Sequence, residues 1–289
     1  MSKQLKPIFI IGNPRSGTTL LRLILNAHSK FVIPPEAGFA FWLYSQYKNF
    51  RYRDLDTFLD DMKSTKKINN WNLDWIELRK FLFKKQPNKY GELINDIYSF
   101  YGDSKGMKIK RWGDKNNFYL NHIEDIKEVF PCVQFIHIVR DGRNVACSYK
   151  KLNKKQIQSA DAPNLPDKIE SIASEWKSNI QKIKKSFESF NYDNVLEVRM
   201  EDLTASPKTE ISKIMSFLGE DFEPSMLEYY KESKIIKSIP KDYLQWKKKN
   251  TLPIQNEPVD KYKTILTEEQ ILRFNKIAKE VLIEYDYSL

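Results

Sequence analysis

The sequence has 289 residues, which is enough to bury a large core as one α/β domain. It carries 48 Lys and Arg residues against 38 Asp and Glu residues, for a net charge of +10. This basic balance suits an anionic ligand, a nucleic acid or an acidic membrane surface, and the charge alone does not choose among them. The first residues are polar and no stretch reaches the length of a membrane span, so we expect a cytoplasmic protein without an integral membrane segment.

The first predicted element is a strand at Ile8–Ile11, followed by a loop that contains glycine. The strand is a short apolar run ended by Gly12, as in a buried strand of a parallel sheet. Gly17 is separated from Gly12 by four residues, and a helix with a broad apolar face follows. A loop of this length before a helix can direct its backbone N–H groups at a phosphate. The stretch therefore predicts an anion site.

The cation of this loop does not stand where nucleotide triphosphatases place it. Their pattern needs Lys after the second Gly, whereas here Thr18 occupies that position and the cation is Arg15. Residues 14–19, Pro-Arg-Ser-Gly-Thr-Thr, resemble the 5′-phosphosulfate loop of sulfotransferases that use 3′-phosphoadenosine 5′-phosphosulfate (PAPS), closest to the tyrosylprotein and bacterial branches. The resemblance implies a donor site made of Arg15, Ser16, Gly17, Thr18 and Thr19. The alternative is a strand-to-helix turn with a surface arginine.

A carboxylate follows the first helix at Glu36. Pro34 and Pro35 precede it and hold the backbone extended, which points Glu36 back over the loop if the chain returns across the sheet. On spacing alone, a solvent-facing side chain is an equally good interpretation. The resemblance to sulfotransferases implies that Glu36 is the catalytic base.

Residues of about 40–105 carry no chemical motif. Their apolar side chains recur at three- and four-residue steps, which predicts two or three amphipathic helices. The resemblance implies that this helical segment helps to form the acceptor side of the site.

A short alternating strand is predicted at Met107–Arg111, with a loop after it that contains Lys115. Residues 113–115, Gly-Asp-Lys, resemble the Gly-Asp-Lys-Thr-Pro segment of sulfotransferases, in which the Lys reaches the transferring sulfuryl group. Asn116 and Asn117 stand in place of the Thr and Pro, so the loop departs from the family's pattern there. An ordinary loop lysine is the alternative for Lys115.

The second clear buried strand is predicted at Val133–Val139. Arg140 stands at its carboxyl end, and Ser148 lies within the first turns of the next helix. Because ligands bind outside the carboxyl ends of strands in an open parallel sheet, both side chains are expected to face the crevice of the first loop. Taken alone, an Arg-Asp-Gly-Arg turn is a common strand end. The resemblance implies that Arg140 and Ser148 bind the 3′-phosphate.

The remaining signals are weaker. A long amphipathic helix is predicted at Ile169–Phe187 and a strand at Val195–Arg199. Residues 201–203, Glu-Asp-Leu, resemble the end of the family's Arg-Tyr-Glu-Asp-Leu segment, with Met200 at the Tyr position. The family also has a basic loop that covers the nucleotide, and the polar stretch 234–260 does not align with it residue by residue.

Together these observations predict one sulfotransferase domain over residues 1–289. Its fold is expected to be α/β and P-loop-like, with a central, mostly parallel sheet flanked by helices. The function implied by the resemblance is sulfuryl transfer from PAPS to a hydroxyl acceptor, with an amine as the less favoured acceptor. Glu36 would take the acceptor proton, while Arg15 and Lys115 would stabilise charge on the sulfuryl oxygens and the leaving phosphate without a metal.

Two other functions remain open at this level. A P-loop kinase-like phosphotransferase would share the fold and the anion loop, but the Walker lysine and an Asp placed to organise magnesium are not visible. A basic nucleic-acid-binding protein would use the positive charge, but its basic residues are scattered and match no binding motif. If Glu36 is not the base, His28 and His122 are the next candidates.

Overall fold

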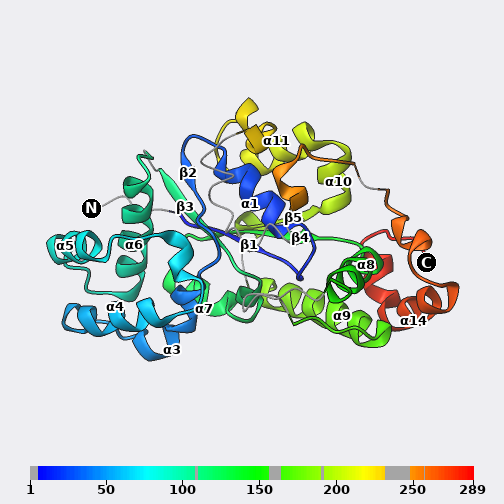
Figure 1. Cartoon of the computed structure of the whole chain (residues 1–289), viewed down its shortest axis with the longest axis horizontal. Coiled ribbons are helices and arrows are strands. Elements are labelled where there is room, and N and C mark those ends of the chain that lie inside the picture. Colours follow the sequence, from blue (N-terminus) through cyan, green and yellow to red (C-terminus); the bar gives the residue numbers. More distant parts are fainter. Residues whose placement is uncertain (1–5, 108–109, 156–163, 190–191, 232–247, 257) are drawn as a thin grey trace.

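One parallel sheet organises the chain. The structure is a computed structural model that describes residues 6–107, 110–155, 164–189, 192–231, 248–256 and 258–289 (Figure 1). Its strands are β1 (Ile8–Ile11), β2 (Phe31–Val32), β3 (Arg111–Lys115), β4 (Gln134–Val139) and β5 (Val195–Arg199). They pair in the order β2-β3-β1-β4-β5, and every pairing is parallel. The prediction of an α/β fold with a parallel central sheet is confirmed.

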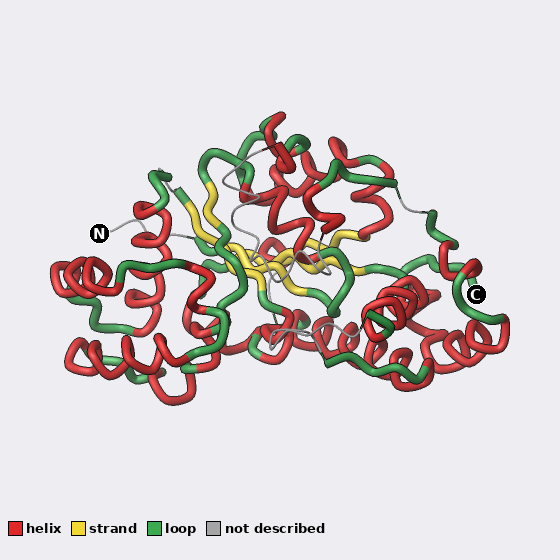
Figure 2. The backbone as a smooth tube through the Cα atoms, in the orientation of Figure 1, coloured by secondary structure: helices red, strands yellow, loops and turns green. Residues whose placement is uncertain are grey.

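Helices cover both faces of this sheet (Figures 1 and 2). One face carries α1 (Thr18–Asn26), α10 (Met200–Ala205) and α11 (Pro207–Leu218). The other carries α7 (Ile123–Val129), α8 (Gly142–Asn153), α9 (Ile169–Phe187) and α14 (Glu268–Glu284). Because side chains alternate along a strand, Ile8 and Ile10 pack with α1 and α11, while Phe9 packs on the opposite face against Phe135. Burial on both faces explains why β1 reads as a continuous apolar run.

A group of helices lies beside the β2–β3 edge, at the left of Figure 1. It comprises α2 (Phe39–Trp42), α3 (Tyr44–Tyr47), α4 (Leu55–Ser64), α5 (Trp75–Lys85) and α6 (Tyr90–Ser104), with a short 3-10 turn, η2 (Ile68–Trp71), between α4 and α5. Tyr98 of α6 stacks on Trp112 of β3, with 4.1 Å between the ring centroids, so an aromatic core joins this group to the sheet. The helices predicted for residues 40–105 are confirmed.

The strand predicted at Met107–Arg111 is wrong in position. The structure has β3 at Arg111–Lys115, and residues 108 and 109 lie outside the described residues. Gly113 pairs beside Ile8, and a Cβ atom on Gly113 would lie 2.8 Å from the Ile8 carbonyl oxygen. All five residues of β3 are buried, including Arg111, Asp114 and Lys115. The sequence of β3 predicts a loop because charged side chains are rarely buried unless each has a partner.

Several later elements match their predictions. The helix Ile169–Phe187 and the strand Val195–Arg199 have the predicted bounds, while β4 begins one residue later than predicted, at Gln134. The short strand β2 was not predicted. Within the polar stretch 234–260, residues 234–247 and 257 lie outside the part of the chain that the structure describes.

Candidate functional site

The carboxyl ends of the strands bring the predicted site residues to one edge of the sheet. The loop with Arg15 follows β1, Glu36 follows β2, Lys115 ends β3 and Arg140 follows β4. Because β1 is central and its two neighbours, β3 and β4, come from later crossovers, the strand order reverses here. Such a switch point is where open α/β sheets bind ligands. The topology therefore supports the expectation that these residues share one crevice.

The loop between β1 and α1 is anchored to neighbouring helices by buried amide side chains. Asn13, fully buried, donates from Nδ2 to the Tyr149 hydroxyl over 3.3 Å and accepts at Oδ1 from Asn179 over 2.7 Å. The Ser16 N–H bonds to the Asn13 carbonyl over 3.1 Å. These contacts attach the loop to α8 and α9. A loop fixed in this way needs little reorganisation to bind an anion.

The backbone of this loop has an unusual shape. Arg15 has φ of 70° and Gly17 has φ of 101°, a left-handed region that favours glycine. A Cβ atom on Gly17 would meet the sulfur atom of the flexible Met200 side chain, so it is the backbone conformation that favours glycine there. No side chain caps the start of α1, and its first turn has no acidic residue. The N–H groups at the N-terminus of α1 are thus left for another partner.

Two guanidinium groups meet at this loop. Arg15 donates from Nε to the Ser148 Oγ atom over 3.0 Å, and Arg140 donates from Nη1 to the Arg15 carbonyl over 3.1 Å. Burial, and then the nearby charge of Arg140, lower the pKa of Arg15 to about 10. Like charges held this close favour an anion between or beside them. The hydroxyl of Ser16 also favours an anion here, because Ser16 Oγ is buried and has no hydrogen-bond partner in the structure.

Glu36 is bound by two lysines. Lys115 donates to Oε1 of Glu36, and the Lys67 Nζ atom lies 3.6 Å from Oε2. The side chain of Lys115 is only 1% exposed, against 11% for Glu36 and 21% for Lys67. Burial lowers the pKa of Lys115, and the charge of Glu36 opposes that shift. Lys115 is therefore a buried partner of Glu36 rather than an ordinary loop lysine.

A second carboxylate, Asp114, precedes Lys115 in β3. It is buried, and its Oδ2 accepts from the hydroxyls of Tyr98 and Tyr119, while its Oδ1 accepts from the Lys115 N–H over 2.7 Å. Burial raises the pKa of Asp114 to about 6, although these hydrogen bonds lower it. Asp114 thus fixes the end of β3 and the direction in which Lys115 leaves it.

The two asparagines that replace Thr and Pro also connect the site. Asn117 accepts at Oδ1 from the Thr18 hydroxyl over 3.3 Å, which links the turn after β3 to the first residue of α1. Asn116 accepts at Oδ1 from the Phe118 N–H over 3.1 Å and so caps the 3-10 turn Asn117–Asn121. The turn after β3 therefore reaches the anion loop despite the altered sequence.

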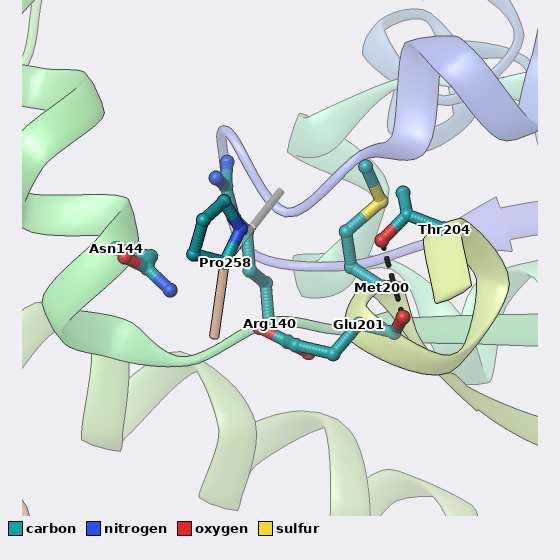
Figure 3. Close-up of a pocket in the computed structure, with 6 residues that line it drawn as sticks. All are labelled: Arg140, Asn144, Met200, Glu201, Thr204 and Pro258. Atoms are coloured by element: carbon teal, nitrogen blue, oxygen red, sulfur yellow. Dashed lines mark hydrogen bonds between the residues drawn. The ribbon is translucent and has the colours of Figure 1, made fainter. Parts of the chain in front are cut away.

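A cleft lies beside Arg140 (Figure 3). It is small, and it is lined by Arg140, Asn144, Met200, Glu201, Thr204 and Pro258. Glu201 accepts from the Asp141 N–H and the Tyr287 hydroxyl, each over 3.0 Å. In Figure 3, Arg140 and Met200 extend toward the loop before α1. Arg140 therefore lines the cleft and also bonds to the anion loop through the Arg15 carbonyl, while Met200 presents a thioether to the cleft.

Sequence reasoning missed several residues of this site. Asn13 lies in the predicted loop but was assigned no role, and no motif contains Lys67, Tyr149 or Asn179. The roles of all four follow only from contacts made by the folded chain. Among the described residues, no group of three or more His, Cys, Asp and Glu side chains is placed to hold a metal ion. Within the same ranges, no helix combines the length and the apolar character needed to span a membrane.

The sequence matches one known family. Residues 7–224 match the profile described as "Sulfotransferase family". Protein-tyrosine sulfotransferase A of Caenorhabditis elegans is 27% identical over 226 residues, which cover 77% of this chain and 52% of that protein. Omega-hydroxy-beta-dihydromenaquinone-9 sulfotransferase Stf3 of Mycobacterium tuberculosis is 24% identical over 256 residues, which cover 77% of this chain and 66% of that protein. The chain thus spans about half to two thirds of the length of these relatives.

Solved structures share the fold. The sulfotransferase domain of the Synechococcus PCC 7002 olefin synthase aligns with a TM-score of 0.64 and 22% identity, over 99% of this chain and 98% of that one. Mouse sulfotransferase SULT7A1, solved in complex with PAP, aligns with a TM-score of 0.51 and 14% identity, over 97% of this chain and 85% of that one. At these identities the likeness is one of fold.

Proposed function

Because the chain belongs to the sulfotransferase family, we propose that it is a PAPS-dependent sulfotransferase that acts on a hydroxyl acceptor. One observation carries the proposal: the loop before α1 contacts Ser148 and Arg140 on one side, and the turn after Lys115 on the other. The positively charged anion loop and Glu36, with its buried partner Lys115, therefore lie at the same edge of the sheet. The proposed domain extends over residues 1–289.

The residues of the loop suit the 5′ end of the donor. Ser16 Oγ is buried without a partner, no side chain caps α1, and Arg15 stands beside a second guanidinium. An anion would satisfy all three at once, since it accepts from the hydroxyl and the N–H groups and offsets the repulsion between cations. Ser16, Gly17, Thr18 and Thr19 would hold the phosphosulfate through backbone N–H groups and hydroxyls.

Arg140 and Ser148 would bind the 3′-phosphate of the donor. The guanidinium group of Arg140 can present two parallel donors to phosphate oxygens, and Ser148 adds a short hydroxyl. The nucleoside would lie on the side of Arg140 where the small cleft opens. Met200 lines that cleft and offers an apolar contact in place of a hydroxyl.

Glu36 is the proposed general base. The acceptor oxygen would form a bond to sulfur, the bond from sulfur to the 5′-phosphate oxygen would break, and the acceptor proton would pass to Glu36. Arg15 and Lys115 would stabilise the charge that develops on the sulfuryl oxygens and the leaving phosphate. These side chains and the N-terminus of α1 supply the positive charge, so we propose no metal in this mechanism.

The acceptor would approach from the helical group α2–α6. This group is tied to the base by the Trp71 Nε1 hydrogen bond to the Pro35 carbonyl, 2.7 Å long, and by the Lys67 ion pair with Glu36. Two relatives are named for a tyrosine and for an omega-hydroxy substrate, which supports a hydroxyl rather than an amine as the acceptor group.

Calorimetry tests this function against its two rivals. The protein should bind 3′-phosphoadenosine 5′-phosphate, while ATP with magnesium and a mixed-sequence oligonucleotide should bind weakly or not at all. Transfer of labelled sulfur from PAPS to acceptors in a cell extract would then identify the product. Preferred binding of ATP with magnesium would indicate a kinase-like enzyme, and preferred binding of the oligonucleotide would indicate a nucleic-acid-binding protein.

A further inference from the structure

Lys67 is a charged residue of the site that no motif contains. It lies in the turn before η2, on the acceptor side, and its Nζ atom is 3.6 Å from Oε2 of Glu36. Its side chain is 21% exposed, so the pair is partly shielded from water. An opposite charge at this distance favours the ionised form of a carboxyl group.

The fold holds Lys67 in this place at a cost. Its φ is 72°, in the left-handed region that is unfavourable for a residue with a side chain. Ile68 and Trp71 of η2 are each 1% exposed, and Trp71 donates from Nε1 to the carbonyl of Pro35, the residue before Glu36. The turn and the segment that carries the base are therefore fastened together. A strained residue held by its surroundings at a candidate site indicates a role there.

The two oxygens of Glu36 have different partners. Oε1 accepts from Lys115 on the donor side, and Oε2 faces Lys67 on the acceptor side. The charges of Arg15 and Asp114 also act on this carboxyl, while Arg22 acts on Lys115. In the proposed function, Lys115 serves the sulfuryl group, so it must turn away from Oε1 when the donor binds. Oε1 then becomes available to the acceptor hydroxyl.

We propose that Lys67 is a positioning residue that keeps Glu36 ionised and oriented through Oε2 while Oε1 takes the acceptor proton. The inference rests on the proposed function for its reaction step, whereas the coupling between Lys67 and Glu36 is a property of the protein alone. Lys67 does not touch the reacting atoms in this scheme. Replacing Lys67 should therefore change the pH at which Glu36 titrates more than the affinity for 3′-phosphoadenosine 5′-phosphate.

The first test measures this coupling without catalysis. The titration of Glu36 is followed by carbon NMR in protein labelled at the Glu carboxyl carbons, with Glu36→Gln used to assign the signal. Lys67→Met should raise the midpoint of Glu36 by roughly one pH unit, and Lys67→Arg should restore it. Lys66→Met is the matched control, because Lys66 is the exposed neighbour and its loss should leave the midpoint unchanged. An unchanged midpoint in Lys67→Met would overturn the proposal, and Lys67→Gln provides the same comparison if Lys67→Met does not fold.

The second test uses catalysis, with PAPS at saturation and a tyrosine-containing peptide as the acceptor probe, because its phenol has a pKa of about 10 and keeps its proton across the acid limb. In Lys67→Met the acid limb of the kcat/KM profile should move up by roughly one pH unit, with about a tenfold loss below it and convergence with wild type above it. Equal losses at every pH would mean a merely structural role and overturn the inference. If the wild-type protein transfers no sulfuryl group, the proposed function fails, while the NMR titration still decides whether Lys67 acts on Glu36.

Discussion

The Nε atom of Arg15 donates a hydrogen bond to the Oγ atom of Ser148 over 3.0 Å, across 133 residues of sequence. Arg140 reinforces the junction through its bond to the Arg15 carbonyl. The loop after β1 and the helix after β4 are therefore in direct contact, so the two proposed anion sites would adjoin and form one surface. A ligand with phosphate groups at both ends suits such a surface better than one with a single phosphate, because each end gains charge-assisted contacts.

The first prediction concerns the 3′-phosphate. Arg140→Ala should weaken binding of 3′-phosphoadenosine 5′-phosphate by about 2–4 kcal/mol, since it removes a charge-assisted contact and leaves an anion without its partner. Adenosine 5′-phosphate should bind poorly to both proteins. Calorimetry measures both affinities, with Lys151→Ala as the control for loss of an exposed charge on α8, the helix that follows Arg140. Equal affinity of the wild-type protein for the two nucleotides would rule out this assignment.

The second prediction concerns the base. Glu36→Gln keeps the shape of the side chain but removes the proton acceptor, so turnover should fall by roughly 10²–10⁴-fold. Binding of 3′-phosphoadenosine 5′-phosphate should stay near wild type, as calorimetry will show. Full turnover in this variant would place the base elsewhere, and His28 and His122 would then be tested in the same assay.

The third prediction concerns the cations. Arg15→Ala and Lys115→Ala should each depress turnover more than donor affinity, because charge fixed beside the leaving oxygen stabilises the transition state more than the ground state. The double variant should cost less than the sum of the single ones, since neighbouring groups that serve one transition state are not additive.

Activity of the wild-type protein should also persist in the presence of a chelator. Single-turnover rates and donor affinities for the four proteins complete the double-mutant cycle. A strict magnesium requirement, or unaltered turnover in Arg15→Ala, would instead favour the kinase-like alternative.

The fourth prediction concerns stability and pH. Burial raises the pKa of Asp114 from 3.8 to about 6, so the folded state holds this proton more tightly than the unfolded state. The contribution of Asp114 to the free energy of unfolding is therefore full below pH 3.8 and is lost as the pH rises through 6.

Urea unfolding of the wild-type protein and Asp114→Asn between pH 4 and 7 measures this effect. The free energy of unfolding of the wild-type protein should fall relative to the variant by on the order of 2–3 kcal/mol over that range. The variant cannot titrate at this position, so any cost of the substitution itself is constant. Parallel profiles for the two proteins would show that Asp114 is not the group that titrates.

The strands β1, β4 and β5 and the helix α9 could be predicted from sequence because their signals are local. An apolar run between turn residues predicts a buried strand, and a 3.6-residue period predicts an amphipathic helix. The loop before α1 was predicted for the same reason, since its glycines and Arg15 lie within a few residues. These features depend on neighbours in the chain, which the sequence contains in full.

The position of β3 and the surroundings of Glu36 were decided only by the tertiary structure. The sequence of β3 does not look like a buried strand, because it contains Arg111, Asp114 and Lys115. Each of these is buried against a partner distant in sequence, which is Gln134, Tyr98 and Glu36, respectively. Lys67 reaches Glu36 only because η2 packs against Pro35 through Trp71. The energy of a charge depends on which groups surround it in space and how much water they exclude, and those groups come together only when the helices beside β3 pack on the sheet.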